Sequence, residues 1–446
     1  MTTPIADFVR AYAASGTLRA HMPGHKGEAL LGPEPLDITE IHGADSLYEE
    51  GGVISESERN AASLFGSRHT LYATEGSSQA IRAMLLLALK KGWRQGKAPV
   101  LLCARNAHRA LFSAAALLDV SLRFLPSAQA SYLSGQVDLS SVEKALSGQA
   151  EPPFAVYLTT PDYLGGMADV GGISKVCQRY GVPLLVDNAH GAYLKFLPES
   201  QHPMDLGAAL CADSAHKTLP VLTGGAYLHI GAPGFTARDG KDALLQFGST
   251  SPSWLTLASL DLANAELANG YPARLAKFTD EVAALRQTLT SLGWALYGEE
   301  PLKLTIRAKR AGYTGDELAD HLRQSRIECE FSDPDDLTLM LTPETGEVGL
   351  RRIREAILSL PIRAPLQEGP GIPLPPEQRV MTPRQALFAP AETVAAEAAV
   401  GRVLAELSVG CPPAVPIVTA GEIVTPEAAA LFRYYGVERV RVVQES

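Results

Sequence analysis

Short apolar runs alternate with helical patterns along the first half of this chain, and the alternation limits the folds available to it. Residues 98–104, 154–160 and 182–187 are apolar runs bounded by polar residues, as expected for buried parallel strands. Residues 78–92 and 171–181 are helical in pattern. Strand, helix and strand in alternation predict a doubly wound α/β sheet. Ligands of such sheets bind beyond the carboxyl ends of the strands.

The patterns also predict how the chain divides into parts. Residues 1–50 are rich in Gly, Pro and His and are expected to form an arm, followed by a large domain over 51–262. A second α/β pattern predicts a smaller domain over 263–360. Seven prolines predict a linker over 361–383, which leaves a C-terminal subdomain over 384–446.

Three local patterns predict particular elements. Ser55, followed by Glu58 three residues later and by Gly66, predicts a capped helix. The run over 327–331 predicts a strand. The segment 391–407 is rich in Ala and Glu and predicts a helix.

Composition excludes several classes of protein. The chain has 446 residues, 46% of them hydrophobic, and a formal net charge of -10, with no run of Lys and Arg, so we expect no nucleic-acid partner. It has neither an apolar run long enough for a membrane span nor a signal-peptide pattern, so we expect no membrane partner. Five scattered cysteines without a CxxC pair favour reduced thiols in a cytoplasmic protein.

Two stretches at predicted strand ends suggest contacts to a ligand. Ser77 and Ser78 follow Gly76 at the expected start of a helix, where free backbone N–H groups and two hydroxyls could cradle a phosphate. The alternative is that the serines serve only as helix caps. His108, just beyond another strand, could stack on an aromatic ligand or pass protons, and a merely hydrogen-bonded loop histidine fits the pattern equally well.

Two further stretches suggest charged chemistry. Asp187 ends an apolar strand, where an ionised carboxylate needs a balancing metal, arginine or protonated ring nitrogen. A metal is disfavoured, because only His190 stands at ligand spacing, and we expect no metal site. Lys217 is either a solvated surface lysine or a lysine whose amine takes part in the chemistry. The signature motifs of nucleotide hydrolysis, dinucleotide binding, zinc proteases and α/β-hydrolases are absent from the sequence.

One cofactor requires all four stretches together. Pyridoxal 5′-phosphate needs a lysine for a Schiff base, an acid for its pyridine nitrogen, an aromatic on one ring face and a phosphate cradle. The sequence resembles the ornithine/lysine/arginine decarboxylases, which are pyridoxal-phosphate enzymes of the aspartate aminotransferase fold. Seven segments in the family's order carry the resemblance: HMPGHKG (21–27), the layout of 39–70, RNAHRA (105–110), TTPDYLGGMAD (159–169), VDNAHGAY (186–193), DSAHKTLPVLT (213–223) and GSTSPSWLTLASLD (248–261).

The resemblance implies an aspartate aminotransferase-like large domain with a mixed, mainly parallel sheet and a smaller C-terminal α/β domain. It also implies a role for each matching residue. Lys217 would bind the cofactor and later move a proton, and Asp187 would pair with the pyridine nitrogen. His108 would stack on one ring face and Ala189 would press against the other. Further cofactor contacts are implied for Ser77, Ser78, Thr160, His190, Ser214, His216 and Thr250, the last from the partner subunit of a dimer.

Several positions depart from the family's motifs. Near the C-terminus, GCPPAVPIVTAGE (410–422) is similar to a family motif in which tyrosine and glycine stand at two of the positions. We expect the departures to affect substrate identity and to leave the cofactor chemistry intact. The long members' N-terminal wing domain is not expected, since HMPGHKG begins at residue 21, so a dimer is expected rather than a ring. The departures are Asp162, Asn188 (where the family's Asp-Glu-Ala-His motif has glutamate), Ala215, Gly224 (where family members often have glutamine), Cys411 and Ala414.

The resemblance implies α-decarboxylation of a basic amino acid (arginine, lysine or ornithine) at the subunit interface of a cytoplasmic homodimer. Glu330 is the best match for the glutamate that family members place near the substrate's distal cation. The main alternative is an aminotransferase or another pyridoxal-phosphate lyase, which would need an arginine such as Arg307 or Arg351 on the α-carboxylate. A cofactor-free regulatory homologue is a third reading, but such proteins tend to lose the lysine or the ring aspartate, and Lys217 and Asp187 are both present.

Overall fold

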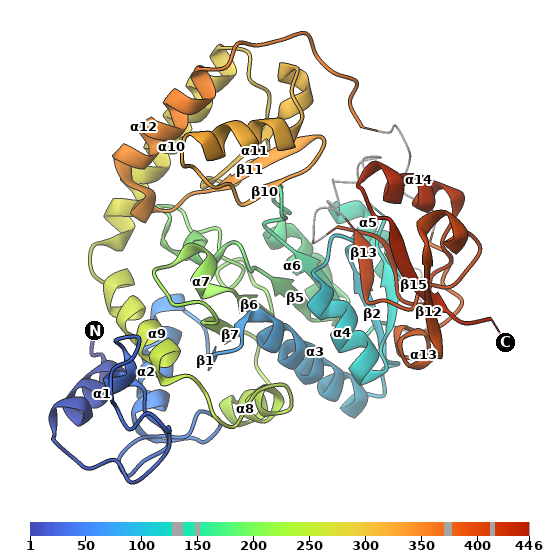
Figure 1. Ribbon diagram of the computed structural model, residues 1–446. Helices are drawn as coiled ribbons and strands as arrows, with labels where there is room; N and C mark the ends of the chain where they lie inside the picture. Colours follow the sequence, from blue (N-terminus) through green and yellow to red (C-terminus); the bar gives the residue numbers. More distant parts are fainter. Residues whose placement is uncertain (127–136, 148–151, 370–376, 411–414, 446) are drawn as a thin grey trace. The chain divides into compact units, whose positions relative to one another are not determined.

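The computed structural model describes residues 1–126, 137–147, 152–369, 377–410 and 415–445. Figure 1 labels their helices and strands, and the residues divide into two compact units. The first unit comprises Met1–Gly96 with Val170–Arg274, and the second comprises Lys97–Asp169 with Leu275–Ser446.

The first unit contains four adjacent strands in the order β1 (His69–Ala73), β7 (Ala226–Ile230), β6 (Leu210–Asp213) and β5 (Leu184–Asp187). β7 is antiparallel to both β1 and β6, and β5 is parallel to β6. β1, β6 and β5 therefore run in one direction, and their carboxyl ends lie at one edge of the sheet.

Helices pack around these strands. One buried carboxylate joins the N-terminal helix to a later helix. Asp261 on α9 (Trp254–Leu267) accepts the backbone N–H groups of Ile5 and Ala6, both at 3.0 Å, which satisfies donors that the first turn of α1 (Pro4–Ala14) leaves open. The helices of this unit are α1 (Pro4–Ala14), α2 (Gly52–Phe65), α3 (Gly76–Arg94), α6 (Val170–Arg179), α7 (Ala215–Thr218), α8 (Ala237–Leu245), α9 (Trp254–Leu267) and the start of α10 (Tyr271–Ser291).

The described residues of the second unit form four groups of strands. Strands β4 (Ala155–Thr159), β2 (Val100–Cys103) and β3 (Ser121–Phe124) are parallel neighbours. An antiparallel sheet follows the order β10 (Phe331–Ser332), β11 (Asp336–Met340), β9 (Lys303–Arg307) and β8 (Leu296–Tyr297). Near the C-terminus β12 (Ala391–Ala395) pairs with β15 (Arg439–Val443), and β13 (Ser408–Gly410) with β14 (Pro416–Thr419). The helices are α4 (Arg109–Leu118), α5 (Leu139–Ser147), α11 (Gly315–Gln324), α12 (Gly346–Leu358), α13 (Pro383–Phe388) and α14 (Pro426–Tyr434).

The predicted α/β class with a mixed, mainly parallel sheet is confirmed. Among the first unit's strands and among β4, β2 and β3, only β7 runs antiparallel to its neighbours. The domain boundaries placed at 50, 262, 360 and 383 stay a prediction.

Three local predictions are corrected. The helix predicted to open at Ser55 begins at Gly52, so Ser55 and Glu58 lie inside it, although it does end at Gly66 in the left-handed conformation. The predicted strand over 327–331 is reduced to β10, which begins at Phe331.

The helix predicted over 391–407 is wrong. Ala391–Ala395 forms β12, and Ala396–Ala399 forms one short 3₁₀ turn. The local preference of Ala and Glu for helix is overridden by pairing with β15, more than forty residues later in the chain. Gly401, with a φ of +84°, then adopts a backbone conformation that does not continue a helix.

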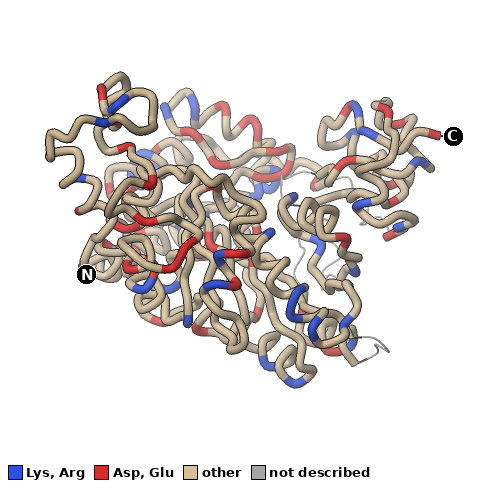
Figure 2. The backbone as a smooth tube through the Cα atoms, turned by 90° about the horizontal axis from the view of Figure 1, so that it is seen from below, with Lys and Arg blue, Asp and Glu red and all other residues tan. Residues whose placement is uncertain are grey.

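The described residues carry charges of both signs. Figure 2 shows Lys and Arg mixed with Asp and Glu along the described backbone. Within the described ranges, no helix combines the length and apolar character needed to cross a membrane. Cys103, Cys177 and Cys211 are buried free thiols and Cys329 is a partly buried one, whereas Cys411 and Ala414 lie outside the described residues.

Candidate active site

The structure brings Lys217 and His190 into contact at the carboxyl edge of the first unit's strands. Lys217 lies on α7, four residues beyond the end of β6, and His190 lies three residues beyond the end of β5. Lys217 Nζ is 3.0 Å from His190 Nε2, and the lysine is partly buried. Since the two strands are parallel neighbours, their ends supply an amine and an imidazole to one place.

Asp187 ends β5 and is fully buried. One of its carboxylate oxygens accepts the backbone N–H of Ala189 at 3.2 Å, and Ala189 is itself buried. The backbone N–H of Asn188 donates to Ala212 on β6 at 2.9 Å, which attaches this turn to the strand that leads to Lys217. A buried carboxylate in this position suits a cationic ring nitrogen as its partner.

The N-terminus of α3 has no side-chain cap. Its N-cap is Glu75, with no side-chain capping hydrogen bond, so Ser77 and Ser78 do not cap the helix. Ser77 is buried, and Ser78 is partly buried. Backbone N–H groups in the first turn of a helix lack partners within the helix, and the helix dipole favours negative charge there. The capping interpretation is therefore wrong, and the phosphate-cradle interpretation stays a prediction.

A glycine pair before β7 joins this helix start to the lysine turn. Gly76 donates its backbone N–H to the carbonyl of Gly224 at 2.7 Å, and His216 donates its backbone N–H to the carbonyl of Gly225 at 3.2 Å. At Gly224, with a φ of +97°, a Cβ would lie 2.6 Å from the carbonyl oxygen of Thr74. This close approach explains why glycine stands where family members often have glutamine.

Ser214 and His216 flank this edge. Ser214 is buried at the N-cap of α7, and its Oγ lies 3.5 Å from His216 Nδ1. His216 Nδ1 is 3.1 Å from the Gly225 carbonyl, so this nitrogen carries a proton. Burial lowers the pKa of His216. His216 would donate to a phosphate through Nε2 only when protonated, a state that a bound anion would itself favour.

Thr250 is exposed, in a segment attached to the start of α3. The backbone N–H of Ser249 donates to the carboxylate of Glu75, and the Ser249 carbonyl accepts from Tyr48 Oη at 3.1 Å. Within one chain, Thr250 is thus next in sequence to a residue bound beside the phosphate cradle. Its contribution to a partner's site stays a prediction.

The remaining predicted residues belong to the second unit. His108 is the N-cap of α4, and its Nδ1 accepts the backbone N–H of Ala110 at 3.2 Å, which orients the ring. Thr160 is buried, and its hydroxyl accepts the backbone N–H of Ala168 at 3.0 Å. Exposed Glu330 accepts a hydrogen bond from Tyr163 Oη at 3.2 Å. The roles of His108, Thr160 and Glu330 toward cofactor and substrate stay predictions.

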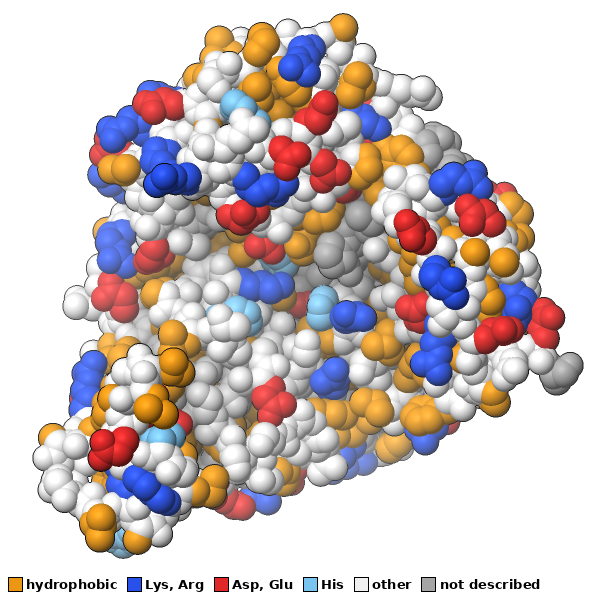
Figure 3. Space-filling model, viewed as in Figure 1, with side chains coloured by type: hydrophobic (Ala, Val, Ile, Leu, Met, Phe, Trp, Pro, Cys, Tyr) orange, Lys and Arg blue, Asp and Glu red, His pale blue; other side chains and the backbone are white. Residues whose placement is uncertain are grey.

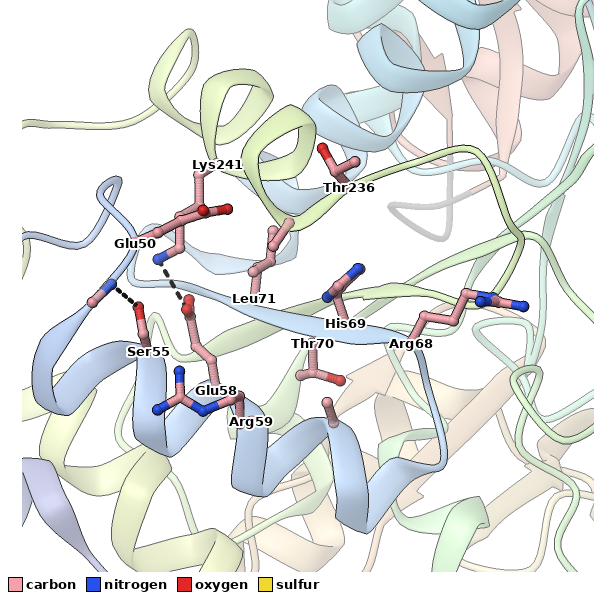
Figure 4. Close-up of a pocket in the computed structure, with 13 residues that line it drawn as sticks. Glu50, Ser55, Glu58, Arg59, Arg68, His69, Thr70, Leu71, Thr236 and Lys241 are labelled. Carbon is pink, nitrogen blue, oxygen red and sulfur yellow. Dashed lines mark hydrogen bonds and ion pairs between the residues drawn. The ribbon is translucent and has the colours of Figure 1, made fainter.

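A separate pocket of about 460 Å³ lies between α2, β1 and the start of α8 and contains none of the predicted site residues. Figure 4 shows the ion pair in it, between Lys241 Nζ and Glu58 at 2.9 Å. Lys241 also donates to the Leu47 carbonyl at 2.7 Å, and Glu58 accepts the Tyr72 backbone N–H at 3.1 Å. Glu58, expected to cap a helix, instead joins three segments of the first unit.

The sequence interpretation missed Asp213, which is buried between the turns that carry Asp187 and Lys217. It accepts hydrogen bonds from Asn188, His202 and His229. The only sequence signal was its position at the start of the DSAHK motif, where the pattern predicts only the last residue of a strand.

Pyridoxal 5′-phosphate fits the residues of the first unit. The uncapped start of α3 suits its phosphate, the buried carboxylate of Asp187 suits its ring nitrogen, and the partly buried amine of Lys217 suits its aldehyde. Together the parallel strand ends and this lysine-centred edge define an α/β enzyme site.

Comparison with known proteins identifies the family. Residues 3–297 match the family model described as Orn/Lys/Arg decarboxylase, major domain. The chain is 30% identical to an arginine decarboxylase of Bacillus subtilis, over 95% of this chain and 92% of that protein. It is also 30% identical to an arginine decarboxylase of Halalkalibacterium halodurans, over 97% of this chain and 93% of that protein.

A solved structure shows the same fold. The lysine decarboxylase LdcF of Francisella novicida superposes with a TM-score of 0.82 at 16% identity, over 99% of this chain and 81% of that chain. The chain belongs to the Orn/Lys/Arg decarboxylase family, as its motifs predicted, and it is an amino-acid decarboxylase.

Proposed function

We propose that this enzyme uses pyridoxal 5′-phosphate to decarboxylate arginine to the corresponding amine and CO₂, as a cytoplasmic homodimer. The observation that carries the proposal is the contact of Lys217 Nζ with His190 Nε2 at the strand edge that also holds Asp187. The choice of arginine is supported by the two relatives at 30% identity, both of which are named arginine decarboxylases.

When bound, pyridoxal 5′-phosphate supplies an electron sink for the pair of electrons left at Cα as CO₂ departs. Asp187 would keep the ring nitrogen protonated, and its burial makes this ion pair stronger than it would be in water. Ser77, Ser78 and the first N–H groups of α3 would hold the phosphate.

Lys217 and His190 would hold and transfer the proton that Cα receives. A protonated Lys217 offers only donors, so His190 Nε2 accepts its hydrogen bond at 3.0 Å. A Lys217 amine that is not bound to the cofactor would lie beside the His190 imidazole, which could take up or return a proton. This pair is the source proposed for the proton delivered to Cα after decarboxylation.

A panel of amino acids tests the proposal. Purified enzyme is incubated with arginine, lysine, ornithine and uncharged amino acids, and both CO₂ release and the amine product are measured. We expect arginine to have the highest kcat/KM. Release of amine from lysine or ornithine alone would contradict the choice of arginine, and a keto acid product without CO₂ would favour the aminotransferase alternative.

Reductive trapping tests the site itself. Borohydride reduction should attach the cofactor to Lys217, and the Lys217→Ala variant should lose the trapped adduct. Lys195→Ala is the matched control, because this lysine pairs with Asp205 at 2.7 Å near the surface of the same unit. Mass-spectrometric location of the adduct on another lysine would contradict the site.

A further inference from the structure

Asp213 lies between the two turns that carry the predicted catalytic residues. It ends β6, directly precedes Ser214 and has no exposed surface. Asn188, the residue after Asp187, donates from Nδ2 to Asp213 Oδ1 at 2.7 Å. This hydrogen bond joins the turn after β5 to the turn after β6.

Three more groups surround the Asp213 carboxylate. His202 Nε2 and His229 Nε2 lie 2.9 and 3.0 Å from Oδ2, and both rings are fully buried. Cys211 donates from its thiol to Oδ1 at 3.3 Å. The backbone N–H of Met204 donates to His202 Nδ1 at 3.3 Å, so the neutral ring carries its proton on Nε2 and donates to Asp213.

The charges of this cluster are defined by its surroundings. Burial acts to raise the pKa of Asp213, but His202 and His229 outweigh it and hold that pKa below its ordinary value. Burial lowers the pKa of His229, against the opposing effect of Asp213. Asp213 is therefore a carboxylate stabilised by hydrogen-bond donors, and such charge-assisted bonds are stronger than neutral ones.

The geometry suits hydrogen bonds better than a metal. His202, Cys211 and Asp213 offer ligand atoms within 4.8 Å of one another. However, the His202 nitrogen that faces Asp213 carries the proton, so it has no lone pair to give. Its 2.9 Å separation from Oδ2 is also shorter than the ~3.4 Å between ligands that tetrahedral zinc bonds of ~2.1 Å would impose.

We propose that Asn188 and Asp213 are a matched pair of positioning residues, whose hydrogen bond holds Asp187 and His190 in register with Lys217. The inference rests on the proposed function. Asn188 is also held through its backbone, since its N–H donates to Ala212 at 2.9 Å and its carbonyl accepts from Gly191 at 2.8 Å.

The pair explains one departure from the family's motifs. A glutamate at position 188, as in the family's Asp-Glu-Ala-His, would place a second carboxylate against Asp213, and two like charges in a buried site disfavour each other. An amide at this position supplies a donor instead. Asn188 and Asp213 are thus chemically dependent on each other.

A double-mutant cycle tests the pair with Asn188→Asp, Asp213→Asn and the double variant. Asn188→Asp keeps the size of the side chain and sets two carboxylates against each other. The double variant restores an amide donor facing a carboxylate, with the polarity reversed. Affinity for pyridoxal 5′-phosphate by absorbance titration, kcat with arginine and melting temperature are measured for each.

We expect Asn188→Asp to weaken cofactor affinity and kcat/KM about 10- to 100-fold, the scale of losing a hydrogen bond to a charged group. The double variant should recover at least tenfold of this loss. Asn264→Asp is the matched control, because Asn264 is equally buried in the same unit and donates to Tyr72 Oη at 2.7 Å. It should lower the melting temperature and leave cofactor affinity unchanged.

Several outcomes would overturn the inference. One is that Asn188→Asp changes only the melting temperature, as the control does. Another is that the double variant has no higher cofactor affinity or kcat than Asn188→Asp. If Asn188→Asp alone does not fold, a double variant that also fails to fold or to bind the cofactor would overturn the inference. A third is that the wild-type protein contains one zinc ion per chain and the Asp213→Asn variant contains none.

The proposed function fails in a different way. Wild-type protein that binds pyridoxal 5′-phosphate but releases CO₂ from no amino acid would contradict the function alone, since cofactor affinity still reports on the pair. Wild-type protein that takes up no cofactor would overturn both.

Discussion

Single residues in this site owe their chemistry to neighbours that are distant in the sequence. Lys217 contacts His190, twenty-seven positions earlier, and Asp213 contacts Asn188, twenty-five positions earlier. Both pairs arise because β5 and β6 are parallel neighbours whose carboxyl ends coincide. Residue identity supplies the functional groups, and the strand pairing sets the distances between them.

Asp187→Ala should remove the counter-charge of the cofactor's ring nitrogen. We expect kcat to fall at least ~100-fold, equivalent to about 2.7 kcal/mol of barrier, because the ring would stabilise the electron pair at Cα poorly. Steady-state kinetics at saturating cofactor checks this. Asp205→Ala, which removes a surface partner of Lys195, is the control and should be nearly normal. Near-normal turnover in Asp187→Ala would contradict the proposed role.

Glu330→Gln should selectively lower kcat/KM for a substrate with a side-chain cation. A charge-assisted hydrogen bond that substrate binding shields from water contributes roughly 1.5 to 3 kcal/mol, so the expected loss is about 10- to 150-fold. Glu328→Gln is the matched control, because its side chain is 73% exposed and lies 3.5 Å from Arg323. Unchanged kinetics in Glu330→Gln would show that this residue is a solvated edge group held by Tyr163.

At the scale of elements, the second unit joins two segments that are far apart in the sequence. Arg105, three residues before His108, forms a bidentate ion pair with Glu422 at 2.9 and 3.0 Å. Arg105 also donates to the carbonyl of Ile417 on β14 at 2.7 Å. Glu422 is almost fully buried, and Arg379 donates to Thr419 Oγ1 beside it. The C-terminal strands thus anchor the loop that leads to His108.

Glu422→Gln should destabilise the protein by about 3 kcal/mol, because it leaves the Arg105 guanidinium with a neutral partner in a buried site. Urea unfolding measures the change, and Glu392→Gln, at an exposed pair with Arg402, is the control. Burial acts to raise the pKa of Glu422, but Arg105 outweighs it and the pKa is lowered. The stabilisation should therefore be complete above about pH 4.5 and decrease as pH falls through the lowered pKa. Equal unfolding curves for wild type and Glu422→Gln would contradict this.

At the scale of the whole molecule, the N-terminal segment exposes apolar side chains. Leu18, Leu30 and Leu31 are 86 to 92% exposed. Figure 3 shows hydrophobic side chains at the surface of this end of the chain. Exposed apolar groups are typical of interaction surfaces, so these leucines are candidates for the interface of the proposed dimer.

The protein should therefore have twice the 47.4 kDa mass of one chain in light scattering coupled to gel filtration. Replacing Leu30 and Leu31 together by Ser should shift the mass toward that of one chain at low concentration, because apolar area is lost from the interface. Leu292→Ser, at a 53% exposed position outside the arm, is the control. A wild-type mass of 47.4 kDa would contradict the dimer.

Local pattern was sufficient for the buried strands and for the motif residues. β2, β4 and β5 lie within the apolar runs that predicted them, because a strand buried on both faces needs a continuous apolar sequence. Ser77, Asp187 and Lys217 were predicted as ligand contacts because strand ends in such folds carry them, and their roles stay predictions. The amino-acid sequence alone thus determined the α/β class and the family, and it supplied the residues of the candidate site as predictions.

Only the tertiary structure decided features that depend on partners distant in the chain. Residues 391–395 pair as a strand with 439–443 in spite of their helical composition. Glu58 binds Lys241 and caps no helix. The sequence predicts Asp213 only as the last residue of a strand, whereas in the folded protein Asn188, His202 and His229 surround it. The physical reason is common to all three: a buried charge or an edge strand is stabilised by whichever group folding brings to it, and local sequence does not specify that group.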